Sequence, residues 1–101
     1  FAECFAARDT LALTQLLVSM EKYKRDQLID TFAQWLEVLT SALADRSGMH
    51  APSAQARLLS AGRSSQELFD AIAHLKKAST YAGGNVSTAA ICGWLVWALR
   101  T

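Results

Sequence analysis

The sequence predicts an all-α fold, a bundle of five to six helices in a single domain that spans residues 1–101. Ala and Leu are the two commonest residues, and both favour helices. Residues that break helices are few, with one proline and five glycines in the chain. Alternation of apolar and polar residues, the sign of a half-buried strand, nowhere extends beyond about four residues.

Two short helices are predicted at the start of the chain. Residues 1–8 form an apolar helical piece, and Asp9 or Thr10 can cap the helix that follows. In that second helix, apolar residues recur at i, i+3, i+4 and i+7, which predicts one buried stripe. The stripe comprises Leu13, Leu16, Leu17 and Met20.

A long third helix follows a charged joint at residues 21–26. It starts near Asp26, where a carboxylate offsets the positive end of the helix, and it ends near Arg46. Gly48 is placed to end it in a left-handed conformation, ahead of a loop at residues 49–52. The predicted apolar face comprises Leu28, Phe32, Trp35, Leu36, Leu39 and Leu43.

The second half of the chain predicts two further helices before the last one. Ser53 can cap a short helix that ends at Gly62, and Ser64 or Ser65 can cap the next, with Glu67 completing a partial capping box. The buried face of that fifth helix is predicted to hold Leu68, Ile72, Leu75 and Ser79, widened by Phe69 and Ala73.

The closing helix, capped by Asn85, is apolar on all sides from residue 89 to residue 99. A membrane-spanning helix needs about 20 apolar residues, so this run is too short to cross a bilayer. Two interpretations stay open: a central helix of the bundle, or a helix with one face on a neighbouring subunit. Gly93 predicts a close approach of another backbone. The predicted contact surface comprises Trp94, Trp97, Val96, Arg100, Lys76 and Tyr81.

The charge balance argues against nucleic acid as the main partner. The net charge is +1 and the isoelectric point is near 8.0, whereas dedicated nucleic-acid binders carry a marked basic excess. Local basic spots are present, and they comprise Lys22, Lys24, Arg25, Lys76 and Lys77. Because Glu21 and Asp26 flank the first group, we interpret it as a solvated joint between helices.

No constellation for catalysis, cofactor binding or metal binding is predicted. The sequence lacks a phosphate-binding loop, a nucleophile elbow and a His-Glu-x-x-His pair. The potential metal ligands Cys4, His50, His74 and Cys92 are too scattered for a zinc site, and His74 is predicted to be half-exposed. Because the two cysteines are far apart in sequence, we expect free thiols rather than a Cys4–Cys92 bridge. Free thiols in turn favour a reduced, cytoplasmic location. The chain is therefore predicted not to be an enzyme.

Four stretches together resemble the C-terminal collar domain of the clamp-loader subunits of bacterial DNA polymerase III, of the delta-prime type. They are "RDTLALTQLLVSMEKYKRDQLID" at residues 8–30, "LIDTFAQWLEVLTSALADRSG" at 28–48, "SSQELFDAIAHLKKASTYAGGNV" at 64–86 and "STAAICGWLVWALR" at 87–100. Each is a pattern of apolar spacing rather than a chemical motif. The chain starts at Phe1, so we expect a domain of a longer protein.

The resemblance implies a non-catalytic domain without cofactor that packs beside its counterparts in the other loader subunits. The assembled collar would hold together an ATP-driven machine that loads the sliding clamp in DNA replication. The isolated domain would then expose apolar surface and self-associate. The alternatives are the collar domain of a gamma/tau or delta subunit, or a stand-alone helical domain with a nucleic-acid-binding or regulatory role.

Overall fold

The computed structural model describes residues 1–46, 54–84 and 86–99, and within these ranges it confirms the all-α prediction. It contains six α-helices, one 3-10 helix and no strand in the described part of the chain. The elements are α1 (Ala2–Ala6), α2 (Thr10–Ser19), η1 (Met20–Lys22), α3 (Arg25–Arg46), α4 (Ala54–Gly62), α5 (Ser65–Ala82) and α6 (Thr88–Leu99).

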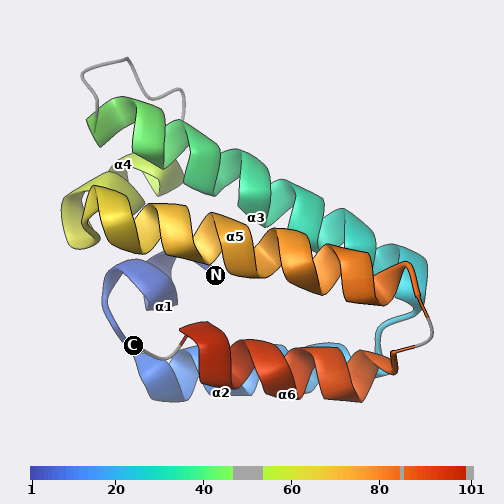
Figure 1. Ribbon diagram of the computed structural model, residues 1–101. Coiled ribbons are helices and arrows are strands. Elements are labelled where there is room, and N and C mark those ends of the chain that lie inside the picture. The colour runs from blue at the N-terminus through green and yellow to red at the C-terminus, as the bar shows by residue number, and fades with distance from the viewer. Residues whose placement is uncertain (47–53, 85, 100–101) are drawn as a thin grey trace.

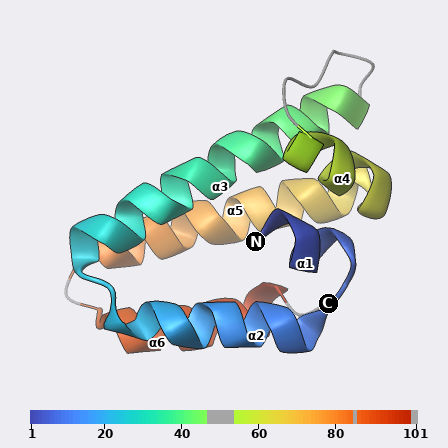
Figure 2. The same cartoon turned by 180° about the vertical axis from the view of Figure 1, so that it is seen from behind.

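The helices form two layers (Figure 1). Helices α3 and α5 lie side by side and run in opposite directions, with α4 at one end of the pair. Helices α2 and α6 form the second layer, which the reverse view shows with α2 in front (Figure 2). Helix α1 joins the layers at the α4 end, where it packs against both α4 and α2. The two layers therefore share one core, to which α6 contributes from the edge rather than from the centre.

The core is built mainly where α3 meets α5. Leu28, Phe32 and Leu39 of α3 and Leu68 and Leu75 of α5 are fully buried. Burying a Leu or Phe side chain stabilises the fold by roughly 1.5–3 kcal/mol, so this contact is the main source of cohesion. Trp35, Leu36 and Leu43 of the predicted α3 face are half-buried against the same core.

Local signals at helix starts are confirmed at two positions. The Asp9 carboxylate accepts a hydrogen bond from the backbone N–H of Ala12 at 3.1 Å, so Asp9 caps α2. At the start of α5, the Ser64 hydroxyl accepts from the Glu67 N–H and the Glu67 carboxylate accepts from the Ser64 N–H. This is a complete capping box, which satisfies two otherwise unpaired donors.

Helix α5 corrects one sequence prediction. Phe69 is 60% exposed and Ala73 is exposed as well, so neither widens the buried face. The buried stripe instead runs through Leu68, Ala71, Leu75, Ala78 and Ala82. Ile72 and Ser79 of the predicted face are half-buried beside this stripe.

Helix α4 depends on a glycine where it meets α1. A Cβ atom at Gly62 would lie 2.5 Å from the carbonyl oxygen of Ala6, which is backbone and cannot swing away. Gly62 is the last residue of α4, as the sequence predicted, and its missing side chain allows the contact. The predicted features at Gly48, His50 and Ser53 lie outside the described residues.

Helix α6 overturns the central-helix interpretation. Ile91, Cys92, Leu95, Ala98 and Leu99 are buried against η1, α2 and α5. The other side is open, since Ala89, Ala90, Gly93 and Trp97 are exposed. A Cβ atom at Gly93 would meet nothing within 4 Å, so the predicted close backbone approach is wrong for the described part of the domain.

The start of α6 also differs from the prediction. Asn85 lies outside the described residues, and α6 begins at Thr88. The Ser87 hydroxyl accepts a hydrogen bond from the Ala90 N–H at 3.2 Å, which is the pattern of an N-cap. Among the described helices, none combines the length and apolar character needed to cross a membrane.

Both cysteines carry free thiols, as the sequence predicted. Cys92 is buried on the inner side of α6, and this burial, with the nearby charge of Glu21, raises the pKa of its thiol to about 11. The Cys92 side chain therefore acts as a small apolar group of the core.

Candidate functional site

The two tryptophans of α6 have different surroundings. Trp94 is half-buried and makes edge-on ring contacts with His74 and Tyr81, at centroid distances of 5.8 and 5.7 Å. The Lys77 ammonium lies 5.9 Å from the same ring centroid. Trp94 and Tyr81, both predicted contact residues, are thus half-buried and in ring contact with each other within the domain.

Trp97 is the predicted contact residue that the structure leaves most open. Its side chain is 64% exposed, and in the described part of the chain no aromatic ring or cation stacks on it. Lys76 is exposed and Val96 is half-buried, whereas Arg100 lies outside the described residues. Trp97, together with the exposed small residues of α6, is therefore the most accessible part of the predicted surface among the described residues.

A hollow of about 430 Å³ lies beside Trp97, between the first half of α5 and the end of α6. We call it the α5–α6 hollow. Its apolar lining includes Phe5, Ala98 and Leu99, and its polar lining on α5 includes Glu67, Asp70 and His74. The three α5 residues fall at i, i+3 and i+7, so they share one face of the helix. Trp97 completes the lining.

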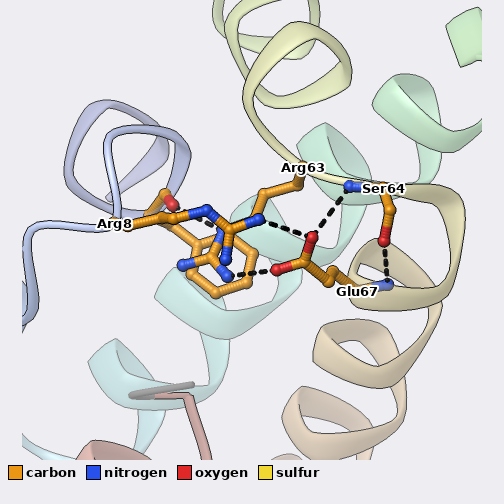
Figure 3. A network of polar contacts seen from close by, with 5 residues as sticks. Arg8, Arg63, Ser64 and Glu67 are labelled. Atoms are coloured by element: carbon orange, nitrogen blue, oxygen red, sulfur yellow. Dashed lines mark hydrogen bonds and ion pairs between the residues drawn. The ribbon is translucent and has the colours of Figure 1, made fainter.

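One end of this hollow is held by a charged network centred on Glu67 (Figure 3). The Glu67 carboxylate accepts from Arg63 Nη1 at 2.6 Å and from Arg8 Nη2 at 2.7 Å. Arg63 is 4% exposed, and its Nε donates to the carbonyl of Phe5 at 2.7 Å. Its guanidinium also lies 4.0 Å from the Phe5 ring centroid. The network ties α1, the α1–α2 turn and the α4–α5 joint to one carboxylate.

The network changes the acidity of Glu67. The hydrogen bond from Arg8 lowers the pKa of this carboxyl to about 2, with further lowering by the Ser64 backbone and by Arg63. Glu67 is thus charged throughout the physiological range, and two guanidinium groups offset that charge. Arg8 holds a left-handed backbone conformation, with φ at 58°, on the turn from which it reaches Glu67.

Asp70 differs from Glu67, one turn further along α5. It is exposed and accepts a hydrogen bond from the Gln66 side-chain amide at 2.9 Å. Both ion pairs of the described residues use Glu67, so Asp70 has no cationic partner there. The lining of the α5–α6 hollow therefore includes both a carboxylate without an ion-pair partner among the described residues and an exposed indole ring.

The basic residues are partly occupied within the domain. The Arg25 guanidinium donates to the carbonyl of Ala82 at 2.8 Å and also to that of Gly84, so it joins the start of α3 to the end of α5. Lys77 lies against Trp94, whereas Lys22 and Lys24 are exposed. The basic joint thus has a structural role for at least one of its cations.

Sequence reasoning identified Glu67 only as a cap and missed its two arginines. The four-residue spacing of Arg63 and Glu67 was a usable signal for a local ion pair across the start of α5. Arg8 gave no such signal, because 59 positions separate it from Glu67. The described residues contain no group of three or more His, Cys, Asp or Glu side chains placed to hold a metal ion.

Comparison of the chain with family models, curated proteins and solved structures finds no match.

Proposed function

We propose that this chain is a non-catalytic assembly domain whose open α6 face binds another protein. The observation that carries the proposal is the exposure of Trp97 beside the α5–α6 hollow. Tryptophan is enriched among residues that dominate binding energy, and such residues are found next to pockets. Ala89, Ala90 and Gly93 extend the open face along α6, where their small side chains allow another helix to approach.

More specifically, we propose the collar of the bacterial DNA polymerase III clamp loader, as the delta-prime subunit, in the cytoplasm. The all-helical fold agrees with this proposal, and the apolar spacing of the four stretches supports it. A collar domain needs one face for its own core and another for a neighbour, which is how α6 divides its residues. The gamma/tau or delta collar domain is the nearest alternative.

Co-purification tests the proposal directly. The chain, tagged and co-expressed with the remaining clamp-loader subunits of its source, is expected to elute with them as one complex of defined mass. Trp97→Ala is expected to weaken this association about tenfold or more. Leu58→Ala is the matched control, because Leu58 is also exposed but lies on α4, which packs against α1 and α3.

The same experiment separates the alternatives. If the chain instead co-purifies with a separate delta-prime subunit, it is not delta-prime itself. That result would favour a gamma/tau or delta identity. Absence of any complex, together with DNA binding that weakens steeply with salt, would favour the nucleic-acid-binding alternative. Self-association of the isolated chain that Trp97→Ala abolishes would support the assembly role without identifying the partner.

A further inference from the structure

The α5–α6 hollow has an uneven distribution of charge. Glu67 forms ion pairs with Arg8 and with Arg63, which also lines the hollow. Asp70, also in the lining, accepts a hydrogen bond from the neutral Gln66 amide and has no ion pair among the described residues. A cationic group that enters the hollow therefore meets a carboxylate that has no direct ion-pair partner among the described residues.

The lining of the hollow matches a long side chain with a charged end. Ala98 and Leu99 offer apolar contact for an aliphatic stem, and Trp97, an exposed aromatic residue of the lining, is the residue type that binds a cation best through its ring. Trp94 shows the same chemistry within the domain, because the Lys77 ammonium lies 5.9 Å from its ring centroid. Trp97 has no such cation in the described part of the chain.

We infer that the α5–α6 hollow receives an arginine side chain of the protein partner, with its guanidinium on Asp70 and against the Trp97 ring. Arginine fits better than lysine because its planar group can stack on an indole and donate two hydrogen bonds to one carboxylate. Arginine is also enriched at protein interfaces, whereas lysine is depleted there. The inference rests on the proposed function only in taking the partner to be a protein.

The arginine site can be tested without knowing the partner. Acetyl-arginine amide is titrated into the ¹⁵N-labelled chain, and the backbone amide and indole N–H signals are followed by NMR. Acetyl-citrulline amide, which has the same shape but no charge, is the matched probe. We expect saturable shifts centred on Trp97, Asp70 and His74 with the arginine probe, and much smaller shifts with citrulline.

Two variants assign the binding to its components. Asp70→Asn is expected to weaken the arginine probe about threefold to fivefold, as for an exposed ion pair. Trp97→Leu is expected to weaken it about threefold through loss of the cation–π contact. Asp30→Asn, which removes an exposed carboxylate of α3, is the control and should leave binding unchanged.

Three results would overturn the inference. One is equal binding of arginine and citrulline, and another is a set of shifts centred away from the hollow. The third is binding that appears only after Arg100→Gln, because the chain's own arginine would then be the occupant. If the arginine probe binds but no loader subunit co-purifies, the clamp-loader proposal fails while the arginine site stands.

Discussion

Trp94 and Trp97 lie three residues apart on the same helix but have different surroundings. Comparing them shows that the open face of α6 lacks covering side chains from the described part of the domain itself. Residues three apart lie only about 60° apart around a helix, so the two rings start from neighbouring positions on α6 and differ in what surrounds them. Trp94 points toward α5, where His74, Tyr81 and Lys77 surround it. Trp97 lies beside the α5–α6 hollow and is 64% exposed. One tryptophan is thus part of the domain's own packing, and the other is available to a partner.

The largest expected effect is the difference in free energy of unfolding between the Trp94→Ala and Trp97→Ala variants. Trp94→Ala should destabilise the domain by about 2–4 kcal/mol, because it removes a half-buried ring with three neighbours. Trp97→Ala should change the free energy of unfolding by less than about 0.5 kcal/mol, as exposed positions do. Urea unfolding followed by circular dichroism measures both. Equal losses would mean that Trp97 is part of the core and that the comparison is wrong.

A second pair of substitutions compares glycines on packed and open surfaces. Gly62→Ala should destabilise the domain by about 1–3 kcal/mol, because its Cβ would lie 2.5 Å from the Ala6 carbonyl oxygen. Gly93→Ala should stabilise it by about 0.5–1 kcal/mol, since alanine favours a helix and the site is open. Thermal unfolding of the two variants provides the measurement. A destabilising Gly93→Ala would show that another backbone does approach α6.

A smaller effect concerns the charged end of the hollow. The pKa of Glu67 is lowered from 4.5 to about 2 in the fold, so its ion pairs stabilise the domain fully above about pH 4.5. That contribution is lost as the pH falls through the interval toward 2, because the unfolded chain binds the proton first. Since Glu67 is partly exposed, we expect it to be worth about 1 kcal/mol.

Glu67→Gln tests this contribution through the pH dependence of urea unfolding. The variant should be less stable than the wild type at pH 7, and the difference should shrink between about pH 4.5 and 2. Glu37→Gln, at an exposed position of α3, serves as the control and should change little. A Glu67→Gln difference that is independent of pH would indicate that the capping box, rather than the ion pairs, provides the stability.

Residues with local signals were predicted well. The cap at Asp9 and the capping box of Ser64 and Glu67 both depend on neighbours within about four positions. The interior side of α6 was harder to predict, because an all-apolar helix has no polar face to mark its outside. The sequence therefore suggested a central helix, and only the placement of η1, α2 and α5 showed which side is covered.

The candidate site illustrates the same limit. Trp97 was named as a contact residue from its type and place, but the hollow beside it combines Phe5 of α1 with α5 and α6. Asp70 was missed because its lack of a cationic partner depends on which side chains lie near it in the fold. The sequence positions of charged residues do not show this. Phe69, its neighbour in sequence, was assigned to the core although it is exposed.

The sequence by itself determined which segments are helical and where most of them begin, since backbone hydrogen bonds and caps act over a few residues. Tertiary structure decided which face of α6 stays open and which arginines meet Glu67. Both outcomes arise from contacts between residues far apart in the chain, which no periodic pattern of apolar residues records.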